Sequence, residues 1–122
     1  MKDQSARPYR VPAGAVAVVF VSQRTPDHDA EYAAAAEAMG ARAAAQPGYI
    51  GIDSVRGSDG IGITVSYWSS ERDAVAWRSD AEHTLIRNEG RAHWYEWYSL
   101  HIAAVGRSYA WRRGEEEPPR TP

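Results

Sequence analysis

The first half of the chain holds one continuous apolar run followed by one helical pattern. Residues 15–22, AVAVVFVS, are rich in β-branched side chains and lack a helical period, which predicts a strand buried on both faces. Residues 31–46 repeat small apolar side chains at helical spacing, and Asp27 and Asp29 place negative charge where a helix start favours it. The apolar face of this helix contains Tyr32, Ala35, Ala36, Met39 and Ala43. Gln46-Pro47-Gly48 ends it.

Two strand patterns come next, joined by a short turn. Residues 49–57 and 60–68 both alternate, and Ser58-Asp59-Gly60 between them is typical of a tight hairpin. The second strand should place Ile61, Ile63, Val65 and Tyr67 on one face and Thr64, Ser66 and Trp68 on the other. Because Tyr67 and Trp68 point in opposite directions, only one of them can face a cavity.

The last third begins with helical signals and ends with a long strand. A serine at 69–70 caps a helix that runs to about Trp77. A second capping pattern at 79–82, SDAE, predicts that a new helix starts after a bend near Arg78. Residues 93–106 then form the final strand. Simple alternation places Trp94, Tyr98, Leu100 and Ile102 on one of its faces and Tyr95, Trp97, His101 and Ala103 on the other.

This order of elements predicts an α+β fold, a ferredoxin-like βαββαβ antiparallel sheet with helices on one face. One helix layer covers one sheet face, so the apolar second face is expected to meet a second copy, giving a homodimer. The domain is expected to span residues 14–111. Residues 1–13 should form a flexible N-terminal arm, and residues 112–122 a disordered charged tail.

Composition narrows the classes of function. The formal net charge of −2 gives no global attraction to nucleic acid or to an anionic membrane, and no apolar run is long enough to span a bilayer. The absence of Cys excludes disulfides and thiolate chemistry. No signal peptide pattern is visible at the N-terminus, so a cytoplasmic location is the expectation. His83 and His93 lack the spacing of a tight metal site.

Several short motifs occur in an informative order. QPGYIG opens the second strand, GITVSYW forms the third, and AW, EH and GRAHWYEWY follow. Over residues 14–111 this pattern resembles the antibiotic biosynthesis monooxygenase superfamily, and within it the small proteins without an assigned reaction. The resemblance implies a dimeric α+β barrel with a pocket between sheet and helices. Members include cofactor-free oxygenases that convert polycyclic phenols to quinones, haem-degrading enzymes, isomerases, and proteins of no known activity.

The family's functional residues match this chain only in part. Trp77 stands at the position of a Trp that the haem-degrading branch uses, and Trp68 matches another residue that shapes the pocket. The first strand lacks the Asn of both branches, since the chain's only Asn is Asn88. Arg87 stands where the haem-ligating His would be, and His83, one helical turn earlier, is the nearest candidate.

The chemistry suggested by these residues is removal of a phenolic proton. A neutral His83 can accept the proton while Arg87, four residues later, stabilises the phenolate, and Trp77 completes the predicted catalytic set. Arg91 can hold a substrate carboxylate or a haem propionate. Each of these residues also has a purely structural alternative, as a surface or core side chain.

Trp68, Arg91, Trp94 and Tyr95 are the predicted substrate-binding residues. Tyr95 can also belong to the dimer face, which is the more common place for a buried Tyr on such a strand. The leading hypothesis is a small monooxygenase that oxidises an aromatic or polycyclic phenol with dioxygen and without a dedicated protein-bound cofactor. The alternatives are a haem-binding or haem-degrading protein with His83 as axial ligand, and a non-catalytic ligand-binding dimer.

Overall fold

A computed structural model describes residues 7–81 and 91–115, and in them the predicted order of elements is confirmed. The elements are β1 (Val16–Arg24), α1 (Asp29–Ala44), β2 (Tyr49–Arg56), β3 (Ile61–Trp68), α2 (Glu71–Ala81) and β4 (Tyr95–Ala104). All neighbouring strands are antiparallel, in the order β2-β3-β1-β4. The fold is therefore α+β and ferredoxin-like, with the most apolar strand, β1, in the interior of the sheet.

The β2–β3 hairpin closes as its turn residues predict. Gly60 adopts a φ of 86°, a left-handed conformation that favours glycine, and the Gly57 amide donates to the Ile61 carbonyl at 2.9 Å. The hairpin pairs Ser54 with Thr64 and Arg56 with Gly62. These two pairs matter for the cavity described below.

The predicted bend near Arg78 is wrong, because α2 continues through it to Ala81. The first cap forms as expected: the Asp73 amide donates to the Ser70 hydroxyl at 3.2 Å. Further along, the buried side chains of Ala74, Trp77 and Ala81 lie on one helical stripe against the sheet. Burying this stripe requires an unbroken helix, and that outweighs the local preference of SDAE for a new start.

A β-bulge in β4 overturns the simple alternation predicted for that strand. Gln23 pairs with Trp97 whereas its neighbour Arg24 pairs with Tyr95, so Glu96 is an extra residue. The bulge moves Tyr95 to the same face as Tyr98, where both rings contact Phe20, with centroids 5.5 and 5.6 Å away. Trp97 remains on the opposite face.

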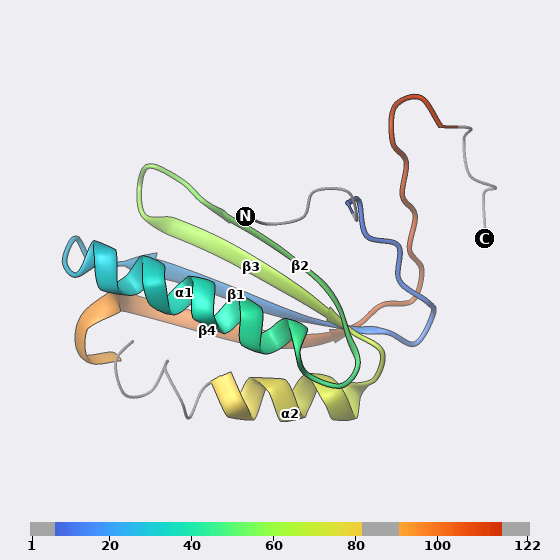
Figure 1. Ribbon diagram of the computed structural model, residues 1–122, viewed down its shortest axis with the longest axis horizontal. Helices are drawn as coiled ribbons and strands as arrows, with labels where there is room; N and C mark the ends of the chain where they lie inside the picture. Colours follow the sequence, from blue (N-terminus) through green and yellow to red (C-terminus); the bar gives the residue numbers. More distant parts are fainter. Residues whose placement is uncertain (1–6, 82–90, 116–122) are drawn as a thin grey trace.

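Both helices lie on one face of the sheet (Figure 1). Their core joins Val16 and Val18 of β1 to side chains of β3, β4 and both helices. The opposite face of the sheet carries Ile63 and Trp97, which remain 44% and 48% exposed in the single chain. Within the described part of the chain, neither helix is long and apolar enough to cross a membrane.

Residues 7–13, from the segment expected to be a flexible arm, lie against the sheet and beside the C-terminal segment (Figure 1). The Val11 amide donates to the Ser108 hydroxyl at 3.0 Å, and the Arg7 guanidinium pairs with Asp53 at 2.9 Å. Tyr9 lies over Gly51, where any β-carbon would collide with its ring. Residues 1–6 of that arm and 116–122 of the expected tail lie outside the described residues.

Candidate functional site

A cavity of about 1010 Å³ lies between the helices and the sheet face that they cover. It exists because α1 presents very small side chains to it. Ala33, Ala36, Gly40 and Ala44 repeat at a spacing of three to four residues and all line the cavity. A helix with Leu or Ile at these positions would fill the space that α1 leaves open above β2 and β3.

Trp77, supported by Trp68, closes one side of this cavity. Trp77 of α2 lines it, and its ring stacks on Trp68 with centroids 5.7 Å apart and an interplanar angle of 24°. Trp68 is fully buried (0% exposed) and its indole nitrogen donates to the Ser66 hydroxyl at 2.9 Å. Trp68, predicted to bind the substrate, therefore supports the wall from behind and does not line the cavity. Tyr67 points to the other face of the sheet, where its hydroxyl donates a hydrogen bond to Asp53.

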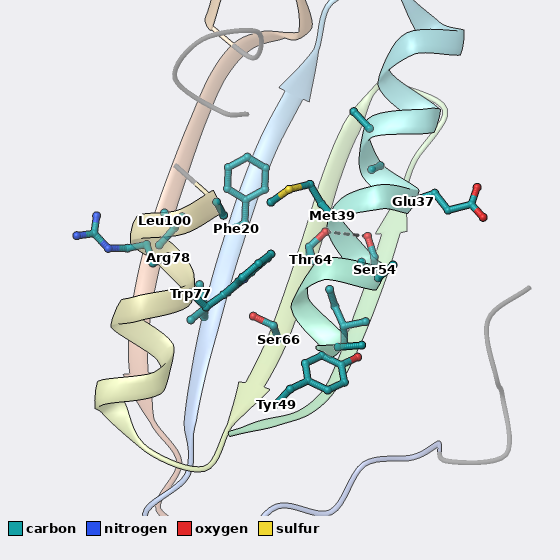
Figure 2. Close-up of a pocket in the computed structure, with 18 of the residues that line it drawn as sticks. Phe20, Glu37, Met39, Tyr49, Ser54, Thr64, Ser66, Trp77, Arg78 and Leu100 are labelled. Atoms are coloured by element: carbon teal, nitrogen blue, oxygen red, sulfur yellow. Dashed lines mark hydrogen bonds between the residues drawn. The ribbon is translucent and has the colours of Figure 1, made fainter. Parts of the chain in front are cut away.

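A row of hydroxyl groups runs along the sheet side of the cavity, and Figure 2 shows it below Met39. The hydroxyls of Ser54 and Thr64 are hydrogen-bonded at 2.7 Å, and Ser66 lies on the same face of β3. Each hydroxyl carries one proton, so the Ser54–Thr64 pair retains one for a ligand, and Ser66, which accepts from Trp68, retains its own. The surrounding lining is mainly apolar, with Phe20, Met39 and Leu100 nearby (Figure 2).

Trp94 and Tyr95 line the cavity at the start of β4, together with Tyr32 of α1. The Trp94 carbonyl accepts a hydrogen bond of 2.8 Å from the guanidinium of Arg24, which also pairs with Asp29 at 2.8 Å. Burial raises the pKa of Tyr95 well above its ordinary value, and the neighbouring Tyr32 raises it further. Tyr95 consequently remains protonated, and able to donate, at every physiological pH.

The other predicted site residues are not among the described residues that line the cavity. Arg91 is exposed, does not line the cavity, and donates to the Tyr98 hydroxyl at 2.9 Å. His83 and Arg87, the predicted base and anion stabiliser, lie outside the described residues. Within residues 7–81 and 91–115, no group of three or more His, Cys, Asp or Glu side chains is arranged to hold a metal ion.

The sequence matches the family model described as "Antibiotic biosynthesis monooxygenase" over residues 15–89, which is more than half of the chain. The chain belongs to the antibiotic biosynthesis monooxygenase family. A relative from Bacillus subtilis strain 168, "Uncharacterized protein YqjZ", is 45% identical over 91 residues, covering 75% of this chain and 79% of that protein. The resemblance to members without an assigned reaction is thereby confirmed.

Solved structures support the same fold for this family member. SnoaB, a cofactor-independent oxygenase from Streptomyces nogalater that was solved as a mutant, aligns with a TM-score of 0.65 at 15% identity, over 79% of this chain and 97% of SnoaB. Rv0793 from Mycobacterium tuberculosis aligns with a TM-score of 0.63 at 17% identity, over 75% and 94%. At these identities the comparison extends to the fold and not to the substrate.

Sequence reasoning missed the polar lining of the cavity. Strand alternation had already placed Thr64 and Ser66 on the same side as Trp68, but without the pairing of β2 with β3 nothing brought Ser54 beside them. The helical pattern predicts Tyr32 only on the packing face of α1, and no pattern in the sequence links it to Arg56, which follows 24 residues later and contacts its hydroxyl. Both omissions concern contacts between elements.

Proposed function

We propose that this protein is a small oxygenase that oxidises an aromatic or polycyclic phenol in the cavity between α1 and the sheet, with dioxygen and without a dedicated protein-bound cofactor. Membership of the family supports monooxygenase-like chemistry in general. The observation that carries the proposal is the cavity itself: about 1010 Å³, with aromatic walls and a row of hydroxyl groups along one side.

The size and lining of the cavity suit a flat, oxygen-bearing molecule. Protein sites for small ligands usually have volumes of roughly 300–1,000 Å³, so this cavity can hold several fused rings. Trp77 and Tyr49 offer aromatic surfaces for them. The hydroxyls of Ser54, Thr64 and Ser66 can donate to oxygen substituents along one edge of the ligand.

The chemistry requires an ionised substrate. A phenolate gives up electrons to dioxygen far more readily than the neutral phenol. One oxygen atom then becomes a ring carbonyl, and the other leaves as water with the two hydrogens lost by the substrate. A general base must first take the phenolic proton, and His83, with Arg87 four residues later in the sequence, remains the predicted base.

Oxygen consumption tests this proposal. The protein should consume dioxygen with a hydroxylated naphthalene or anthrone and form the quinone in equal amount, whereas the methyl ether of the same compound should be inert because it cannot ionise. A His83→Ala variant should lose the activity if His83 is the base. Binding of such ligands without any oxygen consumption would instead support a non-catalytic ligand-binding protein.

The alternative proposal is that this cavity binds haem. Among the described residues that line the cavity there is no His, so they supply no imidazole ligand for the iron, and we derive no step through haem. His83 remains the sequence-based candidate ligand. A sharp Soret band on mixing the purified protein with haemin, lost in His83→Ala, would favour this alternative over the phenol oxygenase.

We also propose that the active form is a homodimer that packs the uncovered sheet faces together. Ile63 and Trp97 lie on that face and remain about half exposed in the single chain.

Light scattering should give twice the chain mass of 13.5 kDa. An Ile63→Asp variant should be monomeric, because an unpaired carboxylate inside the interface costs about 3 kcal/mol or more. Val75→Asp, an exposed position on α2, is the control and should remain dimeric. A monomeric wild-type protein at micromolar concentration would contradict the proposal.

A further inference from the structure

The Tyr32 side chain, at the β4 end of the cavity, is packed on several sides. The Tyr32 ring lies 5.7 Å from Trp94 and 5.8 Å from Tyr95, both in edge-to-face contact. The guanidinium carbon of Arg24 lies 4.0 Å from its centroid, and Arg24 is itself fixed by Asp29 and by the Trp94 carbonyl. These contacts fix the orientation of the Tyr32 ring, and the side chain lines the cavity.

Arg56 approaches the hydroxyl of this phenol from β2. Its Nη2 donates to the Tyr32 oxygen at 2.9 Å and to the Ser22 hydroxyl at 3.1 Å. Its Nη1 donates to the carbonyl of Gly60 at 2.6 Å and to that of Ser22 at 3.4 Å. All four acceptors are neutral, and no carboxylate in the described part of the chain pairs with Arg56. Among the described residues, its positive charge therefore has no carboxylate partner.

The hydrogen bond from Arg56 also orients the Tyr32 hydroxyl. A guanidinium can only donate, so the Tyr32 oxygen accepts from it, and the Tyr32 proton must point away from Arg56. Since the Tyr32 side chain lines the cavity, that proton is available to an acceptor there. Tyr95, the second phenol at this end, lies beside Tyr32, and their hydrogen bond raises the pKa of Tyr95, so Tyr95 keeps its proton and Tyr32 is the acceptor of this bond too.

A glycine on the neighbouring strand makes room for the Arg56 side chain. Gly62 lies directly opposite Arg56 in the hairpin, and a β-carbon at Gly62 would stand 2.5 Å from the guanidinium carbon. Because any β-carbon at this position would overlap the guanidinium, another residue here would displace Arg56 from the place where it contacts Tyr32. The glycine therefore keeps the cation in contact with the phenol.

We propose that Tyr32, with Arg56 behind it, receives the negatively charged phenolate oxygen of the ligand. Tyr32 donates a hydrogen bond to that oxygen, and Arg56 acts through Tyr32 by orienting its proton and by supplying positive charge. Such charge-assisted bonds are stronger than neutral ones and favour the anion over the phenol. The inference rests on the proposed function, because it concerns the same cavity and the ionised substrate that the reaction needs.

The colour of a bound hydroxyanthraquinone tests this inference. Alizarin changes its visible absorption when it ionises, so a pH titration gives its pKa both free and bound. Bound to the wild-type protein, its pKa should fall by about 1 unit, as expected beside an opposite charge. Arg56→Gln should remove most of this shift, and Arg56→Lys should retain part of it. Tyr32→Phe should bind the dye anion about tenfold more weakly, the loss expected for a hydrogen bond to a charged group.

Gly62→Ala is the matched variant, because it keeps both Tyr32 and Arg56 but displaces the guanidinium. It should also return the pKa of the bound dye towards the free value, and circular dichroism should confirm that each variant is folded. An unshifted pKa in the wild type, or the same shift in Arg56→Gln, would overturn the inference and leave the phenol-binding cavity intact. If alizarin does not bind and no phenol supports oxygen consumption, both proposals fail.

Discussion

Trp68→Ala will lower the free energy of unfolding by about 3–5 kcal/mol, the range measured for the loss of large buried aromatic side chains. Trp68 is fully buried, stacks on Trp77, and contacts the Tyr49 ring edge-to-face at 5.7 Å. The substitution leaves a void behind the cavity wall and removes the donor that satisfies the Ser66 hydroxyl. Urea denaturation followed by circular dichroism measures the effect.

The same substitution at an exposed tryptophan is the control. Trp111, in the C-terminal segment, is 51% exposed, and Trp111→Ala should change the free energy of unfolding by about 0.5 kcal/mol or less. A similar loss in the two variants would mean that Trp68 does not anchor the core. Trp68→Phe should recover part of the stability, because a phenyl ring still packs against Trp77.

Ala36→Trp will weaken the binding of an aromatic ligand by about tenfold or more, a loss of at least about 1.4 kcal/mol in binding free energy. Ala36 lies on the side of α1 that lines the cavity, where small side chains create the free space. An indole introduced there competes with the ligand for that space. Quenching of tryptophan fluorescence or the absorption change of bound alizarin gives the dissociation constant.

Ala34→Trp is the matched control on the same helix. Ala34 is exposed and does not line the cavity, so the ligand should bind as it does to the wild type. Both variants carry the same helix-propensity cost, up to about 0.7 kcal/mol, so their stabilities should be similar. Equal affinity in Ala36→Trp and Ala34→Trp would show that the ligand binds elsewhere and would remove the basis of the proposed function.

The sequence determined the order and type of the elements. Hydrophobic period, turn glycines and the serine cap of α2 are local signals, because they depend on residues a few positions apart. The glycine at 60 and the cap at Ser70 therefore formed as predicted. The short motifs from QPGYIG to GRAHWYEWY likewise identified the family, since motif order is a property of the chain itself.

Where local preference competed with burial, only the tertiary structure decided. The cap pattern at 79–82 favours a new helix start, but burial of the stripe that includes Trp77 and Ala81 outweighs it, so α2 continues without interruption to Ala81. Strand alternation failed at Tyr95 because a bulge depends on how β4 pairs with β1, which lies about 80 residues earlier.

The candidate site divides in the same way. Trp77, Trp94 and Tyr95 could be named from the sequence because large aromatics near the ends of elements are recognisable, and all three line the cavity. The Tyr32–Arg56 contact could not be predicted from the sequence. It joins α1 to β2, and no local pattern specifies how the helix packs on the sheet or in which register the strands pair. The chain's own order determines which side chains each element carries, whereas long-range pairing and packing decide which of them meet.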